Sequence, residues 1–224
     1  MNGKAKAIEQ IVRTGLIPIV RASTPDQALR IMEAVLAGGI STVEVTMTVP
    51  GALKVLEQMA DRLGNQVLLG AGTILDPETA RAAILSGAQF IVSPHLNPRV
   101  VEMARRYGCV SIPAGLTPTE IVAAWEAGAD FVKVFPCGNV GGASYIRALR
   151  GPLPHIELIP TGGVNLETAG EFLKAGAAAV GVGTELVDRK AVQEGRYEVV
   201  TENARKFAAA VARARAGSPP PAPK

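Results

Sequence analysis

LIPIVRASTPDQALRIMEAVLAGGISTVEVTM, residues 16–47, decides the fold because it holds one complete strand–helix–strand unit. The apolar, β-branched runs at 16–21 and 41–47 predict two buried strands. Between them, Ser23-Thr24-Pro25-Asp26 is typical of a helix start, with a capping residue, proline at the first helical position and an acid in the first turn. Ala37-Gly38-Gly39 predicts the helix end, where a glycine adopts a left-handed conformation. Strands joined in this way pair in parallel.

The same unit recurs along the chain. A strand returns roughly every 23 residues, which leaves room for a helix of three turns and two short loops. The predicted strands lie near 16–21, 41–47, 67–71, 89–93, 109–113, 129–135, 156–160 and 178–182. Eight parallel strands in about 170 residues favour a closed (β/α)₈ TIM barrel over an open doubly wound sheet, which is the alternative.

The two ends of the chain complete this α/β architecture. Residues 2–14 are expected to form an extra N-terminal helix that covers the bottom of the barrel, and residues 196–215 a final helix. One barrel domain is therefore expected over residues 1–215. The Pro-rich tail, 216–224, is expected to be disordered.

Composition excludes several classes of protein. Of 224 residues, 48% are hydrophobic but only 4% aromatic, so the core must be aliphatic. The net charge of +3, without a basic block that carries aromatic residues, argues against a nucleic-acid partner. No apolar run approaches 18 residues, and the N-terminus lacks the apolar stretch of a signal peptide, so we expect a cytoplasmic protein with no membrane partner. Cys109 and Cys137 lie in or beside apolar runs, which favours two buried thiols over one disulfide.

Lys133 is the first candidate for chemistry. It stands in ADFVKVFP, residues 129–136, near the end of the sixth predicted strand, where barrel active sites lie. Alternation places Phe131, Lys133 and Phe135 on one face. If that face is the lumen, desolvation lowers the pKa of the lysine and frees the amine to attack carbonyls. The alternative is a lysine that reaches solvent from an edge strand.

Glu44 is the second candidate. It shares one face of the second strand with Thr42, Thr46 and Thr48, opposite an apolar face suited to packing under helices. A carboxylate inside a barrel needs a partner or a role in proton transfer. An ion pair with Lys133 and a catalytic role are compatible.

Glycine-bearing turns follow three strands. Thr161-Gly162-Gly163 and Gly181-Val182-Gly183-Thr184 end the seventh and eighth strands, where barrels often bind phosphate through backbone N–H groups. Asn165 and Thr184 are candidate side-chain donors, and simple turns are the alternative. Gly70-Ala71-Gly72-Thr73 does not match a dinucleotide fingerprint, because position 75 is leucine, but Thr73 is suited to a substrate carboxylate. The two histidines, His95 and His155, form no metal-ligand pattern, so no metal is expected.

Five motifs in order give the chain a resemblance. EVT at 44–46, GAGT at 70–73, SP at 93–94, KVFP at 133–136 and PTGGV at 160–164 resemble the 2-keto-3-deoxy-6-phosphogluconate (KDPG) and 4-hydroxy-2-oxoglutarate (KHG) aldolase family. The similarity runs from about residue 10 to 210.

The resemblance implies a homotrimeric class I aldolase that cleaves a small 2-keto acid, KDPG, to pyruvate and glyceraldehyde 3-phosphate. It implies a covalent Schiff base on Lys133 without a cofactor, and Glu44 as general acid and base. It also implies roles in substrate binding and phosphate binding. The implied substrate contacts are Thr73, Pro94 and Phe135, and the implied phosphate contacts are Gly162, Gly163, Gly183 and Thr184.

One position departs from the pattern of many family members. Where they carry an arginine that holds the keto-acid carboxylate, this chain has Thr48, and Arg21 at the end of the first strand is the candidate replacement. Other functions stay open at this point. They are cleavage of 4-hydroxy-2-oxoglutarate, cleavage of a galactonate-series epimer, a phosphosugar isomerase or epimerase, and a trimeric scaffold without activity.

Overall fold

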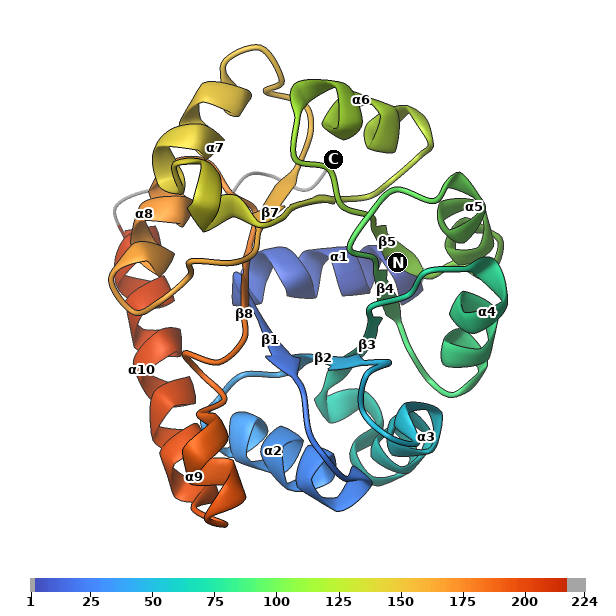
Figure 1. Ribbon diagram of the computed structural model, residues 1–224, viewed down its shortest axis with the longest axis vertical. Coiled ribbons are helices and arrows are strands. Elements are labelled where there is room, and N and C mark those ends of the chain that lie inside the picture. The colour runs from blue at the N-terminus through green and yellow to red at the C-terminus, as the bar shows by residue number, and fades with distance from the viewer. Residues whose placement is uncertain (1–2, 217–224) are drawn as a thin grey trace.

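A computed structural model describes residues 3–216, and its eight short strands surround one central axis (Figure 1). The strands are β1 (Leu16–Val20), β2 (Thr42–Thr46), β3 (Leu68–Gly72), β4 (Phe90–Val92), β5 (Val110–Ile112), β6 (Val132–Val134), β7 (Leu158–Pro160) and β8 (Val180–Val182). Each lies within one of the ranges predicted from the sequence, or starts or ends within a residue of it.

The strands close into a barrel. Six of them pair in the order β5-β4-β3-β2-β1-β8, all parallel, and β6 pairs with β7. Single parallel bridges, Ala114 to Lys133 and Thr161 to Gly181, join the two groups on both sides. The predicted (β/α)₈ barrel is confirmed, and the open sheet is wrong.

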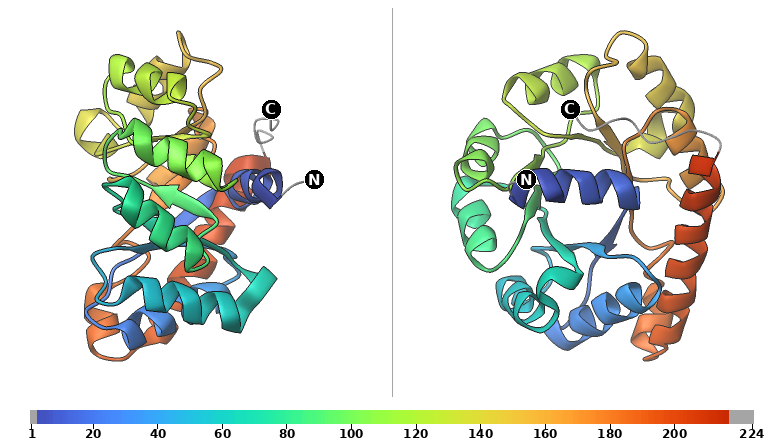
Figure 2. Two further views of the ribbon diagram at one scale, coloured as in Figure 1. Left: turned by 90° about the vertical axis from the view of Figure 1, so that its right-hand side faces the viewer. Right: turned by 180° about the vertical axis from the view of Figure 1, so that it is seen from behind.

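Helices surround the strands (Figure 2). They are α1 (Gly3–Thr14), α2 (Pro25–Ala37), α3 (Ala52–Leu63), α4 (Pro77–Leu85), α5 (Pro98–Arg106), α6 (Pro118–Glu126), α7 (Ala143–Arg150), α8 (Thr168–Lys174), α9 (Arg189–Gln193) and α10 (Tyr197–Ala216), with short 3-10 turns η1 (Gly64–Gln66) and η2 (Cys137–Val140). Proline occupies the first helical position of α2, as predicted, and also of α4 and α6. The predicted end of α2 carries Gly39 with a positive φ, and the same holds for Gly87, Gly108, Gly128 and Gly176 after later helices.

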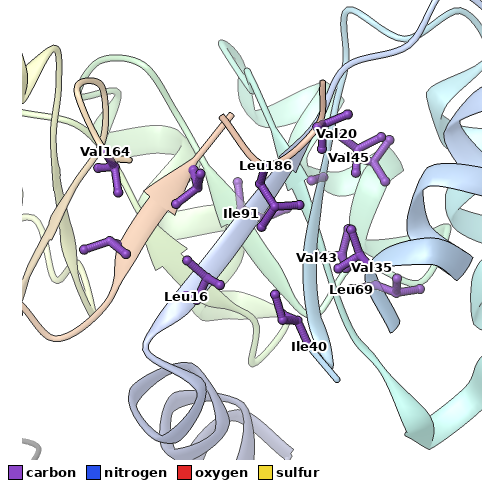
Figure 3. Close-up of a cluster of buried hydrophobic side chains, with 14 of the residues drawn as sticks. Leu16, Val20, Val35, Ile40, Val43, Val45, Leu69, Ile91, Val164 and Leu186 are labelled. Atoms are coloured by element: carbon purple, nitrogen blue, oxygen red, sulfur yellow. The ribbon is translucent and has the colours of Figure 1, made fainter. Parts of the chain in front are cut away.

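Alternation along the strands creates two cores. Outward-facing side chains such as Val20, Val43 and Val45 pack under the helices, where Val35 of α2 meets them (Figure 3). Inward-facing side chains such as Phe90 and Phe131 fill the lower lumen in a separate cluster. Gly70 makes room for Phe90, because a β-carbon at position 70 would collide with its ring.

Helix α1 lies across the open end of the barrel opposite the strand C-termini (Figure 2). Its apolar face, with Ile11, joins the lumen cluster. Lys4 forms an ion pair of 2.9 Å with Asp130, whose carboxylate also accepts hydrogen bonds from the backbone N–H and hydroxyl of Ser111. Gln10 donates to the Ser41 carbonyl at 2.7 Å. The extra helix therefore seals the bottom, as predicted.

The last helix, α10, packs on α2 and α8 and ties the chain ends together (Figure 1). Arg215 donates hydrogen bonds to the carbonyls of Val12 and Arg13 and, at 3.2 Å, to that of Ala178. Apart from Ala216, which ends α10, the predicted Pro-rich tail lies outside the described residues. Within residues 3–216 no helix is both long and apolar enough to span a bilayer.

Candidate active site

Lys133 lies in the upper lumen, two residues beyond Phe131 on the same face of β6. Its side chain is only 7% exposed. Burial lowers the pKa of the amine and nearby Arg21 lowers it further, while the carboxylate of Glu44 acts in the opposite direction. The Nζ atom lies 4.9 Å from the centroid of the Phe135 ring. In a closed barrel β6 has no free edge, so the solvent-reaching edge lysine is excluded.

Glu44 enters the same region from β2 and is 3% exposed. The carboxylate lies over the backbone of Gly72 in β3, because a β-carbon at that position would collide with it. Burial raises the pKa of Glu44, against the opposing charges of Lys133 and Arg21. Desolvation therefore favours the neutral form of each of these two buried groups, while the opposite charge of the other group favours its charged form. Lys133 and Glu44 do not form an ion pair within 4.0 Å among residues 3–216, but each acts electrostatically on the other. Two such neighbours suit a site where a proton moves between an amine and a carboxyl group.

The hydroxyl of Thr48 is already engaged. Thr46 donates its single hydroxyl proton to the Val20 carbonyl at 3.1 Å, so the 2.7 Å contact between Thr46 and Thr48 uses the proton of Thr48. Thr48 then offers only lone pairs to a ligand. To donate to a carboxylate, it would have to give up this bond. Through the bond from Thr46, these hydroxyls also hold the backbone of Val20, the residue before Arg21.

Thr73 has an unusual backbone. It is the non-glycine residue with a positive φ, 59°, among residues 3–216. Non-glycine residues in this region carry strain and cluster at functional sites. Thr73 immediately follows β3, beside the Gly72–Glu44 contact, at the end of the barrel where the strands terminate.

Phe135 stands between two hollows at the mouth. On one side, it lines a cavity of about 430 Å³ together with Pro94 of the loop after β4. On the other, it lines a cavity of about 220 Å³, called here the main cavity, together with Ile19 and Thr161. The structure thus brings the predicted substrate contacts Pro94 and Phe135 to one hollow.

The main cavity collects the glycine turns after β7 and β8. Gly162, Gly163, Gly183 and Thr184 all line it, with Arg21. Gly162 and Gly163 have φ of 87° and 75°. A β-carbon on Gly163 would also fall 2.8 Å from the Cα of Gly138, so the loops after β6 and β7 need glycine to cross.

Arg21 extends toward the eighth strand. Its Nη1 atom lies 3.9 Å from the point a β-carbon on Gly183 would occupy. It also acts electrostatically on both Glu44 and Lys133. The pairing of Ile19 with Glu44 in neighbouring strands explains this position, because Arg21 follows Ile19 on the same face.

Some features of the site were missed by the sequence interpretation. Glu185 lines the main cavity as an acidic residue beside the glycine turns. Asn165, which was predicted as a candidate side-chain donor, also lines it, and its Oδ1 accepts hydrogen bonds from the N–H groups of Glu167 and Thr168 at the start of α8. The roles of Gly72 and Thr46 depend on neighbours from other strands. Their signal in the sequence was only that glycine and threonine occupy lumen-facing positions of predicted strands.

The remaining reactive groups are buried or dispersed. Cys109 and Cys137 are free and buried, as predicted, and burial raises the pKa of their thiols to about 12 and about 11. In the part of the chain that the structure describes, no three His, Cys, Asp or Glu side chains are grouped to hold a metal ion.

Comparison with known proteins agrees with this geometry. The profile of the "KDPG and KHG aldolase" family matches residues 8–203. The 2-dehydro-3-deoxy-6-phosphogalactonate aldolase of Escherichia coli (strain K12) is 36% identical over 189 residues, 81% of this chain and 92% of the relative. The 2-dehydro-3-deoxy-phosphogluconate aldolase of Treponema pallidum (strain Nichols) is 34% identical over 86% of this chain and 91% of its own. The KDPG aldolase of Legionella pneumophila, solved with pyruvate captured at low pH as a covalent carbinolamine intermediate, superposes with a TM-score of 0.83 at 28% identity, covering 90% of this chain and 97% of its own.

Proposed function

Because the chain belongs to the KDPG and KHG aldolase family, we propose that it is a class I aldolase that cleaves KDPG to pyruvate and glyceraldehyde 3-phosphate. The observation that carries this proposal is the buried Lys133 amine in the electrostatic field of the Glu44 carboxyl group. A phosphosugar isomerase would not need Lys133 as a nucleophile, and a scaffold would need neither group. Desolvation frees the amine from its proton, and only the neutral amine attacks a ketone.

The reaction follows from these two groups. The neutral Lys133 amine adds to the C2 ketone, and a proton passes to the oxygen to give a carbinolamine. Protonated Glu44 then assists loss of this hydroxyl as water, which leaves an iminium ion. Glu44, now a carboxylate, takes the proton of the C4 hydroxyl. The C3–C4 bond breaks, its electron pair moves into the iminium, and the aldehyde departs. Protonation of the resulting enamine at C3 and addition of water release pyruvate and the free amine.

Covalent trapping tests the proposal. Pyruvate with sodium borohydride should add one reduced pyruvyl group per chain, located by peptide mass spectrometry on Lys133. Lys133→Arg places a permanently charged guanidinium there, which offers no comparable nucleophile, so it should show neither adduct nor cleavage. An adduct on another lysine, or none on any, would contradict the mechanism.

The galactonate-series epimer is a second candidate substrate, favoured by the 36% identical relative named for it. The two substrates differ in configuration at C4 and give the same products. Comparison of kcat/KM on the two separate epimers therefore decides between them. A chain selective for KDPG should prefer its epimer, and the reverse preference would assign the galactonate series. A preference for 4-hydroxy-2-oxoglutarate, which lacks phosphate, would contradict both.

The phosphate is proposed to lie in the main cavity, held by backbone N–H groups of Gly162, Gly163 and Gly183 and by the Thr184 hydroxyl. Gly163→Val should erase most of the advantage of phosphorylated substrates, because the branched side chain enters the crossing with Gly138 and forbids the positive φ. Gly39→Ala is a matched control, since it also replaces a glycine of positive φ but lies at the end of α2, with nothing near its β-carbon.

Arg21 is proposed to bind an anionic group of the substrate at the boundary between the glycine turns and the Glu44–Lys133 pair. Charge-assisted hydrogen bonds contribute about 1.5–3 kcal/mol, so Arg21→Met should raise KM by roughly 10- to 150-fold. If Arg21 serves only to hold Glu44 ionised, KM should stay nearly constant and the acidic limb of the pH–rate profile should shift instead. Substrates with and without phosphate separate a phosphate contact, where only the first is affected, from a carboxylate contact, where both are.

Assembly and location complete the proposal. We propose a homotrimer, as the family resemblance implies, located in the cytoplasm. Analytical ultracentrifugation should give a mass of about three chains of 23.2 kDa. A monomer at micromolar concentration would contradict the trimer without affecting the proposed chemistry.

A further inference from the structure

A second cavity adjoins the main one on the side of α9. This outer cavity has a volume of about 250 Å³ and lies between the loop after β1 and helix α9. Its polar lining comprises Arg21, Ser23, Gln27, Arg189 and Gln193. Among residues 3–216, no acidic side chain lines it. The outer cavity therefore offers hydrogen-bond donors and two positive charges.

The two guanidinium groups are exposed, and Arg21 also acts electrostatically on Glu44 and Lys133. Among residues 3–216 neither Arg21 nor Arg189 takes part in an ion pair, whereas the neighbouring Arg30 and Arg196 pair with Asp26 and Glu194. The nearby acid Asp188 caps α9, where its carboxylate accepts the backbone N–H of Ala191 at 2.7 Å, and it does not line the outer cavity.

Gln27 adds amide donors to the outer cavity. Its carbonyl oxygen accepts the Ser23 N–H at 3.2 Å, which directs the other end of the amide, a donor group, away from that bond. The lining thus presents guanidinium and amide donors without a carboxylate acceptor. Such a lining is suited to an anion rather than to a sugar or a cation.

A small hollow, called here the neck, shares lining residues with both the main and the outer cavity. It has a volume of about 10 Å³ and is lined by Arg21, Gly183, Thr184 and Arg189, among others. Arg21 lines the main cavity, the neck and the outer cavity. An anion in the outer cavity would consequently share Arg21 with whatever occupies the glycine turns.

We propose that the outer cavity is a second phosphate subsite, in which Arg189 and Arg21 grip a phosphate group through their paired N–H donors. The inference rests on the proposed function in one respect, which is that the glycine turns hold the first phosphate. The occupant is either inorganic phosphate or the terminal phosphate of a substrate whose aldehyde half is longer than three carbons. Arg189 then sets the reach and affinity of the site for phosphorylated ligands.

Equilibrium dialysis with labelled inorganic phosphate tests the subsite. The wild-type protein should bind two phosphates per chain and Arg189→Gln one, with the affinity of the lost site reduced roughly tenfold or more. Arg189→Lys should recover part of this affinity. Lys190→Gln removes the same charge from the next residue, which lines neither the outer cavity nor the neck, and should keep two sites. A single phosphate in the wild-type protein, or equal losses in Arg189→Gln and Lys190→Gln, would overturn the proposal.

Kinetics distinguishes the two sources of phosphate. If a long substrate is the occupant, Arg189→Gln should lower the ratio of kcat/KM for a five-carbon to a three-carbon phosphorylated aldehyde half. If free phosphate is the occupant, that ratio should stay constant, and inhibition by inorganic phosphate should weaken instead. Borohydride trapping on the wild-type protein is independent of these readouts. Two phosphate sites without a pyruvyl adduct would therefore retain the subsite and reject the aldolase.

Discussion

The bottom and the mouth of the barrel are built from the same strands, but their side chains have opposite effects on stability. At the bottom, Phe131 of the β5–β6 connection packs in an aliphatic and aromatic cluster under α1, and the polar groups nearby are paired, as Lys4 is with Asp130. At the mouth, two residues further along β6, Lys133 is buried and loses solvation. Glu44 on β2 is likewise buried and loses solvation. One layer of side chains therefore separates a region that stabilises the fold from a region that costs stability.

The difference shows what a reactive amine requires. Desolvation is unfavourable for Lys133 and Glu44, and the folded structure tolerates it because the surrounding barrel supplies an excess of apolar burial. Substitutions at the mouth should lose activity and gain stability, while substitutions at the bottom should lose stability and keep activity. Four predictions test this contrast.

The largest effect is expected for Lys133→Met. Methionine fills similar space without a charge, so cleavage and trapping should vanish while Tm rises. A gain of 1 kcal/mol corresponds to about 2–4 °C in a domain of this size. Because the pKa of Lys133 is lowered from 10.5 in the fold, its cost to stability is full below the pKa of the folded state and fades as the pH rises from there toward 10.5. Thermal melts between pH 7 and 10 should therefore show a shrinking advantage of the variant. An unchanged or lower Tm at pH 7 would contradict the contrast.

Glu44→Gln should slow turnover by about 10²–10⁴-fold, the usual contribution of a general acid and base. The pKa of Glu44 is raised by burial, so the folded protein holds its proton more strongly than the unfolded chain does. The stability of the wild-type protein should accordingly fall as the pH rises above 4.5, through the pKa of the folded state, and glutamine removes this dependence.

Urea unfolding of the wild type and Glu44→Gln at pH 4, 5.5 and 7 measures the difference. The advantage of Glu44→Gln should grow with pH. Asp130→Asn is the control at the bottom, where the carboxylate has an ion pair and hydrogen bonds. That change should lower stability, because asparagine cannot pair with Lys4. If both substitutions stabilise, the division between mouth and bottom is wrong.

The bottom of the barrel supplies the third prediction. Phe131 is 1% exposed in the lumen cluster, and Phe131→Leu should lower the free energy of unfolding by about 1–3 kcal/mol through lost contacts and a residual cavity. Trapping of pyruvate on Lys133 should continue at a similar rate, since leucine keeps the layer below the amine apolar. Loss of trapping with little loss of stability would mean that the two layers act together.

The contrast also explains which features of the barrel could be predicted from the sequence. The strands and the lumen face of β2 and β6 follow from a period of two, so Glu44 and Lys133 were recognisable one strand at a time. Two contacts depend on which strands are neighbours and on their register. One is the close approach of the Glu44 carboxylate to Gly72, and the other is the hydrogen bond that Thr48 donates to Thr46. Arg189 lies on a five-residue helix with no strong pattern of its own, and only the closed barrel brings it beside Arg21.

The smallest effect is expected at Thr73, where the backbone itself is strained. A left-handed conformation costs a non-glycine residue about 1–2 kcal/mol. Replacement by glycine removes this cost but lowers stability by about 0.5–1 kcal/mol, because glycine has more conformational freedom in the unfolded chain. Thr73→Gly should therefore stabilise the protein by at most about 1.5 kcal/mol. It also removes the hydroxyl proposed to hold the substrate carboxylate, so KM should rise for exchange of the pyruvate methyl protons with D₂O, a reaction that needs only the enamine.

Two matched variants separate strain from hydroxyl at this position. Thr73→Ala keeps the strained backbone and loses the hydroxyl, so its KM should rise like that of Thr73→Gly while its stability does not increase. Thr73→Ser keeps both, and should resemble the wild type in KM and in the free energy of unfolding. NMR measures the exchange, and urea unfolding measures the stability. If Thr73→Gly gains stability and keeps its KM, the φ of 59° is a cost without a function at the carboxylate. If Thr73→Ser also raises KM, the methyl group positions the ligand, and the mouth of the barrel recognises pyruvate by shape as well as by charge.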